Sequence, residues 1–202
     1  MRTSSRFFLA AALAFAAVLP ARSATEPPDA LVKRTVDEVL GVIKQSQDRA
    51  TLRKLAEQKV LPYFDFKEMT RLAVGTAWRK ATPQQQRELE ENFRTLLVNT
   101  YTNALSQAGP RGSRTVEVRP AHVSKNNNAT VKTIVKESGK QPFEIDYRMS
   151  NREGAWKVYD VTVEGVSLVT NYRTTFAEEV SRSGIDGLIK ALKERNSTLA
   201  KG

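Results

Sequence analysis

Few residues in this sequence are of the types that perform catalysis. The chain has no cysteine and one histidine, His122, which excludes thiol chemistry and cysteine-ligated metal sites. His122 follows Pro120 near the end of an expected strand, and no nucleophile motif surrounds it, so we interpret it as a surface or turn histidine. A single histidine without cysteine also argues against a zinc site. Neither a glycine-rich phosphate loop nor a nucleophile elbow occurs in the sequence.

Three carboxylates are the remaining candidates for catalysis. Two of them could act as general acid and general base if they met across a sheet. Asp146, Asp160 and Glu164 fall on neighbouring expected strands. Asp146 has the opposite alternation from its apolar neighbours, so we expect it to face solvent. Asp160 lies among aromatic residues, with Lys157, Arg148 and Arg173 available as partners. Because ion pairs need such residues as much as catalysis does, we favour structural pairing and predict no enzymatic activity.

The elements that precede these residues are predicted to be helical. Apolar residues recur at helical spacing over 30–44 and again in a shorter second segment. Asp65 is expected to cap a third helix that ends at Gly75. The strongest local signal is Thr82-Pro83-Gln84-Gln85, a capping box with proline at the first helical position. It opens a long helix that we expect to end near Gln107.

After Arg114 the apolar period changes from about 3.6 to two residues, which predicts strands. The four predicted strands cover 115–119, 129–137, 143–149 and 155–164. Short links between consecutive strands predict an antiparallel meander. Helical spacing returns after it, and Ser183-Gly184 separates two last helices. The expected fold is therefore α+β, with a curved four-stranded antiparallel sheet covered by helices. Its expected segments are helices over 30–107, the sheet over 114–164 and helices over 167–196.

The stretch from Trp156 to Phe176 connects the last predicted strand to the helix that follows it. Gly165 stands where the period changes, as a sharp redirection of the backbone would require. We expect this bend to carry Val163 and Val166 from the sheet floor to the helix wall. A sheet face and a helix stripe that meet at such a corner enclose apolar volume. Close packing makes a solid core the default, but periodicity does not separate a core from a ligand cavity.

The first residues indicate export. A basic start precedes the unbroken apolar run Phe7–Leu19, and Ala21-Arg22-Ser23 places small residues at the positions that a signal peptidase reads. The run is shorter than the roughly 20 residues that span a bilayer, although an uncleaved membrane anchor is the alternative interpretation. We therefore predict a signal peptide over 1–23, a single domain over 24–202 and a periplasmic location.

Cleavage would remove three arginines and no acidic residue, which lowers the formal charge from +10 to +7. Basic surfaces bind nucleic acid, anionic membranes or acidic protein partners. Export makes nucleic acid the least expected of these, and simple solubility is an equally good explanation.

Two long blocks of the sequence resemble the MlaC family of periplasmic phospholipid-binding proteins, also described as toluene-tolerance auxiliary components. They are YFDFKEMTRLAVGTAWRKATPQQ, from Tyr63 to Gln85, and WKVYDVTVEGVSLVTNYRTTF, from Trp156 to Phe176. The resemblance covers essentially the mature chain. It implies a nuclear-transport-factor-like sheet and a deep apolar pocket that takes phospholipid acyl chains, with the lipid as cargo and no cofactor.

The same resemblance implies a non-catalytic carrier that shuttles phospholipids between membranes and maintains outer-membrane lipid asymmetry. The implied partners are an outer-membrane lipoprotein–porin complex and an inner-membrane ABC transporter complex with an MCE-domain subunit; we expect a monomer. Two alternatives stay open: a periplasmic enzyme on the same scaffold, and an interaction module with a solid core.

The candidate lipid-binding residues are the apolar side chains that alternation and helical spacing direct inward. They are Phe93, Leu97, Tyr101, Val131, Ile145, Tyr147, Val161, Val163, Val166, Leu168, Tyr172 and Phe176. These assignments depend on alternation, so a slip of one residue would invert the contribution of a whole strand.

Overall fold

The computed structural model describes residues 26–46, 48–107, 114–152 and 154–201. The predicted signal peptide lies outside these residues, as does the segment 108–113 that follows the expected end of the long helix. The helices are α1 (Pro28–Gln45), α2 (Arg49–Leu55), α3 (Phe66–Val74), α4 (Pro83–Gln107) and α5 (Leu168–Lys201). The strands are β1 (Arg114–Val118), β2 (His122–Val123), β3 (Asn128–Glu137), β4 (Phe143–Arg152), β5 (Ala155–Val163) and β6 (Val166–Ser167).

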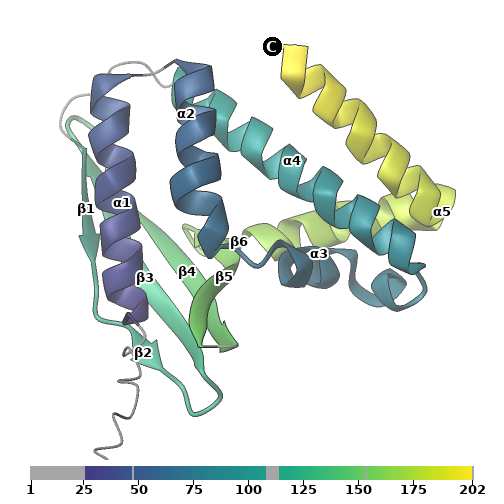
Figure 1. Ribbon diagram of the computed structural model, residues 1–202, viewed down its shortest axis with the longest axis horizontal. Coiled ribbons are helices and arrows are strands. Elements are labelled where there is room, and N and C mark those ends of the chain that lie inside the picture. Colours follow the sequence, from purple (N-terminus) through teal and green to yellow (C-terminus); the bar gives the residue numbers. More distant parts are fainter. Residues whose placement is uncertain (1–25, 47, 108–113, 153, 202) are drawn as a thin grey trace, which may run out of the picture.

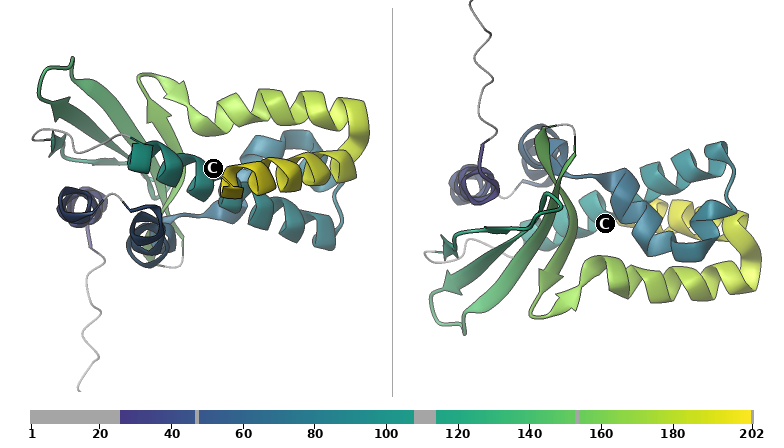
Figure 2. Two further views of the ribbon diagram at one scale, coloured as in Figure 1. Left: turned by 90° about the horizontal axis from the view of Figure 1, so that it is seen from above. Right: turned by 90° about the horizontal axis from the view of Figure 1, so that it is seen from below.

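The molecule has two parts, an antiparallel sheet with two helices over it and a group of helices beside it (Figure 1). α1 and α2 lie side by side over one face of the sheet, whereas α3, α4 and α5 pack together at its side (Figure 2). No helix within the described ranges is both long and apolar enough to cross a membrane.

The helix starts expected from the sequence are present. The Asp65 carboxylate accepts a hydrogen bond from Glu68 N at 2.9 Å and caps α3. Thr82 and Gln85 form the reciprocal capping box of α4, with Gln85 N donating to Thr82 Oγ1 at 3.2 Å and Thr82 N donating to Gln85 Oε1 at 2.9 Å. Gly75 has φ 65° directly after α3, a conformation that glycine adopts without steric cost.

The sheet confirms the α+β class and the antiparallel meander, with two short strands added to the four expected ones. Its order is β1-β3-β4-β5-β6, and β2 pairs with β3 beside β1. Phe64 forms an isolated parallel bridge with Val158, and Asp65 N donates to Val158 O at 2.8 Å. These contacts connect the segment before α3 to β5.

A β-bulge interrupts the pairing of β4 with β5. Arg148 lies opposite Asp160, whereas Met149 lies opposite Val158, so that Tyr159 is the extra residue of β5. A bulge of this kind shifts the alternation of side chains by one position. Trp156 and Val158 consequently share the inner face of the sheet with Val161 and Val163. Strict alternation would instead place the first two residues on the opposite face from the last two.

The connection from the sheet to α5 differs from the expected single bend at Gly165. Glu164 and Gly165, with φ 48° and 82°, form a two-residue turn, and positive φ at both positions is typical of a type I′ hairpin. Val166 then pairs with Val163 in β6 before α5 begins at Leu168. The expectation that Gly165 carries Val166 onto the helix wall is therefore wrong: Val166 belongs to a short edge strand and is 63% exposed.

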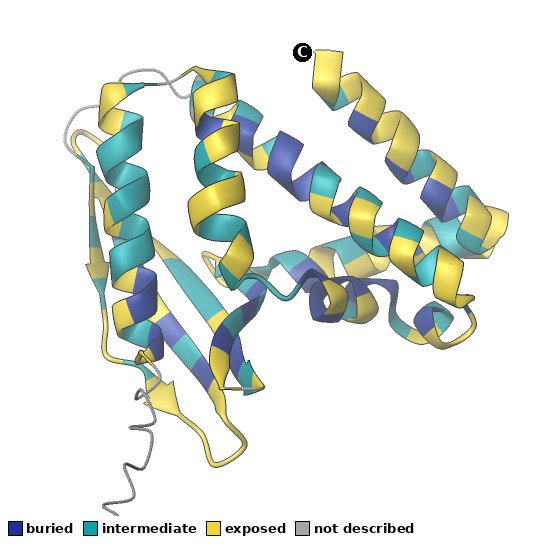
Figure 3. Ribbon diagram, viewed as in Figure 1, coloured by how far each residue is buried: buried dark blue, intermediate teal, exposed yellow. Residues whose placement is uncertain are grey.

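Buried side chains form two clusters, one among the helices and one under α1 (Figure 3). The helical cluster centres on Phe93, whose ring packs edge-on against Tyr172 and Phe176 at centroid distances of 4.9 and 5.1 Å. The second cluster includes Leu31 and Val131 and lies between α1 and the sheet. α5 bends at Gly184, where φ is 72° and ψ −173°, and its second half returns along α4 (Figure 1).

Candidate binding pocket

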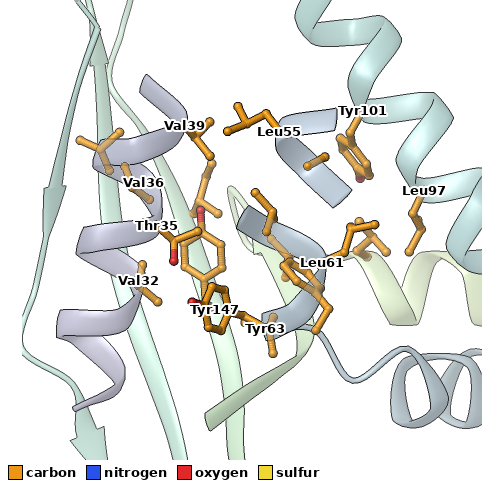
Figure 4. A pocket seen from close by; sticks show the side chains of 18 of the residues that line it. Val32, Thr35, Val36, Val39, Leu55, Leu61, Tyr63, Leu97, Tyr101 and Tyr147 are labelled. Atoms are coloured by element: carbon orange, nitrogen blue, oxygen red, sulfur yellow. The ribbon is translucent and has the colours of Figure 1, made fainter. Parts of the chain in front are cut away.

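A cavity of about 460 Å³ lies between the inner face of the sheet and helices α1, α2 and α4 (Figure 4). Its wall is almost entirely apolar. The lining residues on the helices and their connections are Leu31, Val32, Thr35, Val36, Val39, Leu40, Ile43, Leu52, Leu55, Ala56, Val60, Leu61, Tyr63, Phe64, Phe66, Met69, Leu97, Val98, Tyr101, Thr102 and Leu168. Those on the strands are Arg114, Val116, Val135, Phe143, Ile145, Tyr147, Met149, Val158, Val161 and Val163.

One wall of the cavity is the apolar stripe of α1. Val32, Val36 and Val39 recur at intervals of three and four residues, which places them on one side of the helix. In Figure 4 these side chains point from α1 toward the space in front of Tyr147. They are only half-buried, except for Val32, because the cavity separates them from the sheet.

α2 and the π turn that follows it supply the second wall. After Leu55 the helix continues as one π turn, in which Leu61 N donates to Ala56 O, five residues back. A π turn is wider than an α-helical turn and rotates the residues that follow it. Leu55, Ala56, Val60 and Leu61 all line the cavity, so this segment presents more apolar surface than a regular helix of the same length.

The bulge in β5 makes the sheet a continuous apolar floor. Val158 and Val161 are three residues apart, an odd spacing that would place them on opposite faces of a regular strand. Because Tyr159 is the extra residue, both line the cavity together with Val163. On β4, the regular alternation of Ile145, Tyr147 and Met149 brings these side chains to the same floor.

Of the residues that the sequence marks as candidates, the structure brings one group together at this cavity. That group is Leu97, Tyr101, Ile145, Tyr147, Val161, Val163 and Leu168. Leu97 and Tyr101 reach it from α4, as Figure 4 shows. Tyr101 and Val163 remain 47% and 37% exposed, so their edges of the cavity meet solvent.

The remaining candidates do not line the cavity. Phe93, Tyr172 and Phe176 pack on one another in the solid helical core. Val131 faces the correct side of the sheet but is fully buried in the cluster that α1 covers. Val166 lies in the edge strand β6, is exposed and does not line the cavity. Tyr172 and Phe176 share one stripe of α5, and that stripe packs against Phe93 of α4.

The sequence did not indicate the contributions of α1 and α2 to the cavity. Helical spacing predicts the apolar stripes of α1 and α2. It does not predict whether a stripe packs against other side chains or lines a cavity. The same holds for Val116, Val135 and Phe143, which alternate as expected in β1, β3 and β4 and line one end of the cavity.

The few polar groups of the wall are mostly neutral hydroxyls. Burial raises the pKa of the Tyr147 phenol to about 12, so it stays protonated at neutral pH. Tyr63 accepts a hydrogen bond from Arg34 Nη2 at 3.3 Å, and Thr35 donates to Leu31 O at 2.8 Å. Polar groups of this kind add little charge to the cavity, which suits an uncharged, apolar ligand segment.

The possible catalytic residues do not gather at the cavity. His122 is exposed in the short strand β2, as the sequence indicates. Asp146, expected to face solvent, is half-buried and opposite Lys132 and Thr162 on the other face of the sheet. Within the described ranges, histidine and carboxylate side chains form no cluster that could hold a metal ion.

Asp160 is a structural residue, as its expected pairing predicts. It is 1% exposed and accepts hydrogen bonds from Ser167 Oγ at 2.7 Å and Val169 N at 3.1 Å. Ser167 in turn accepts from Thr170 N at 3.1 Å, so the two side chains together satisfy the first amides of α5. Arg148 Nη1 is 3.5 Å from Asp160 Oδ2 but half-exposed, so this ion pair contributes little.

We therefore expect Asp160→Ala to lower the free energy of unfolding by about 2–3 kcal/mol, because a buried hydroxyl and an amide lose their acceptor. Urea denaturation followed by circular dichroism measures the change. Asp160→Asn, whose amide oxygen still accepts, should lose less. Ligand content per folded molecule should stay unchanged in both variants; a folded variant that loses a chemical activity instead would contradict the structural role.

Comparison with known proteins places the fold and the cavity in context. The family model described as MlaC protein matches residues 33–194. The chain belongs to the MlaC family. Its relatives include toluene tolerance protein ttg2D of Pseudomonas putida, 28% identical over 169 residues, covering 81% of this chain and 77% of that protein. The intermembrane phospholipid transport system binding protein MlaC of Haemophilus influenzae is 23% identical over 179 residues, covering 84% of this chain and 82% of that protein.

A solved structure of this kind carries its ligand. The phospholipid-binding protein of Ralstonia solanacearum, determined in complex with a phospholipid, is 35% identical and superposes with a TM-score of 0.77. The match covers 87% of this chain and 99% of the Ralstonia chain. The MlaC fold seen here is thus shared with a protein whose structure contains a phospholipid.

Proposed function

We propose that this MlaC-family protein is a non-catalytic phospholipid carrier whose cavity takes the acyl chains. The observation that carries the proposal is the apolar cavity of about 460 Å³ between α1, α2, α4 and the sheet. The phospholipid complex of the Ralstonia relative supports it. The absence of a nucleophile–base pair from the described wall of the cavity favours a carrier over an enzyme.

The physical demand on such a carrier explains the composition of the wall. Each methylene removed from water contributes about 0.8 kcal/mol, so a tail of some sixteen carbons represents on the order of 12 kcal/mol. A carrier extracts a lipid only if its cavity is nearly as apolar as the bilayer. In the described strands and helices, most of the backbone is hydrogen-bonded within those elements, which limits the unpaired polar groups that meet the tail.

The same balance allows the lipid to leave again. When the cavity and the bilayer solvate the tail almost equally, the net free energy of transfer is small in both directions. We propose that the mature chain works in the periplasm and shuttles phospholipids between the two membranes, in support of outer-membrane lipid asymmetry. Its proposed partners are an outer-membrane lipoprotein–porin complex and an inner-membrane ABC transporter complex with an MCE-domain subunit. It needs no cofactor and acts as a monomer.

The direct test is lipid extraction from protein purified without detergent, followed by mass spectrometry. We expect close to stoichiometric phospholipid, and we expect lipid-free protein to take up phospholipid from vesicles. His122→Ala should behave as the unchanged protein does, since His122 is exposed and remote from the cavity wall. Protein that contains no phospholipid and takes up none from vesicles would refute the carrier function.

A further inference from the structure

Arg114 is the one charged side chain among the described residues that line the cavity. It lies at the start of β1, two residues before Val116, so both side chains are on the inner face of the sheet. Opposite it on β3 is Glu137. Val116, Val135 and Phe143, which line the same end of the cavity, are their neighbours in the adjacent pairs.

The guanidinium of Arg114 is only partly satisfied by the protein. Its Nη2 donates to Glu137 Oε2 at 2.9 Å, whereas its Nε is buried and finds no acceptor among the described residues. A buried donor without a partner is unfavourable, and a cationic one more so. In this otherwise apolar wall, an anionic ligand group would supply an acceptor for the guanidinium.

The charge at this end of the cavity favours an anion. Glu137 also pairs with Lys140 Nζ at 3.1 Å, so two cations share one carboxylate. The Arg114 side chain is 19% exposed and that of Lys140 54% exposed, so the group extends from the cavity wall into solvent. An amphiphile with its tails in the cavity would place its polar end at such a boundary.

We propose that the Arg114 guanidinium binds the phosphate of the phospholipid head group, while Glu137, which also pairs with Lys140, holds the guanidinium in place. The proposal rests on the carrier function and adds to it a specific polar contact. Guanidinium and phosphate oxygens form strong, charge-assisted hydrogen bonds. Arg114 would therefore make the cavity prefer phospholipids to phosphate-free lipids that have the same tails.

The test compares two lipids that differ in the phosphate. Lipid-free protein is equilibrated with vesicles that contain palmitoyl-oleoyl phosphatidylglycerol and the diacylglycerol with the same chains, and bound lipid is measured by mass spectrometry. Arg114→Gln should lower phosphatidylglycerol uptake roughly tenfold and leave diacylglycerol uptake unchanged. The matched control is Arg119→Gln, which removes a cation that is 55% exposed just after the same strand. It should change neither uptake.

The other outcomes decide against the proposal. An equal loss of both lipids in Arg114→Gln would make Arg114 only a structural part of the wall. Wild-type protein that takes up neither lipid would refute the carrier function itself, which is a distinguishable result.

Inorganic phosphate alone should not raise the melting temperature of the lipid-free protein; a rise that Arg114→Gln abolishes would assign the site to a free anion. If Arg114→Gln fails to fold because Glu137 loses one of its cationic partners, the double variant Arg114→Gln/Glu137→Gln is tested for the same selective loss.

Discussion

Val39→Trp should remove most phospholipid uptake, by tenfold or more, while the lipid-free protein stays at least as stable as the wild type. Val39 lies on the side of α1 that faces the cavity (Figure 4) and is only half-buried. An indole in that position would occupy space that the acyl chain needs. It would also bury apolar surface, at about 25 cal/mol per Å², without displacing a packed neighbour. Valine and tryptophan have similar helix propensities, so α1 itself should be unaffected.

The measurement pairs lipid content by mass spectrometry with the free energy of unfolding from urea denaturation. Ala30→Trp is the matched control, because Ala30 is exposed on the same helix and does not line the cavity. It should retain lipid in wild-type amount. If Val39→Trp is folded and still carries its full complement of phospholipid, the lipid site lies elsewhere.

Phe93→Ala should lower the free energy of unfolding by about 3–5 kcal/mol and leave lipid content per folded molecule unchanged. Phe93 is fully buried, and its ring contacts those of Tyr172 and Phe176. Truncation removes these edge-to-face contacts and leaves a void in the helical core. Because Phe93 does not line the cavity, the lipid content should not respond.

Tyr101→Ala on the same helix is the matched comparison. Tyr101 is 47% exposed and lines the cavity, so its truncation should change stability by less than about 1 kcal/mol but lower lipid uptake several-fold. Thermal unfolding and vesicle uptake measure the two effects. A loss of lipid in Phe93→Ala comparable to that in Tyr101→Ala would return Phe93 to the lipid site, as its position on the stripe predicts.

The contrast between Phe93 and Tyr101 shows how far helical spacing can predict a site. Both residues belong to the apolar stripe of α4, and the sequence treats them alike. In the structure the stripe first contacts α5 and then, two turns later, reaches the space beside α2. Which part of the stripe contacts protein depends on where α5 bends back, and that is a long-range property.

The strand residues show a second limit. Ile145 and Tyr147 both line the cavity, because β4 alternates regularly along it. Strict alternation would place Val158 on the face opposite to Val161, but the bulge at Tyr159 changes the alternation within β5 and puts both on the same face. No glycine or proline marks the bulge in the sequence. It was detectable only from the pairing with β4, since Arg148 and Met149 have to meet partners that are two residues apart.

By itself, the sequence determined the helix starts, the strands and the α+β class. Capping by Asp65 and Thr82, and apolar periods of two and 3.6, depend on residues within a few positions of one another, so they can be read locally. Only the tertiary structure decided which apolar surface is core and which is cavity. That choice depends on the spacing between α1, α2 and the sheet and on the bulge in β5. The stretch from Trp156 to Phe176 contains both outcomes, with Val161 facing the cavity and Phe176 in the core.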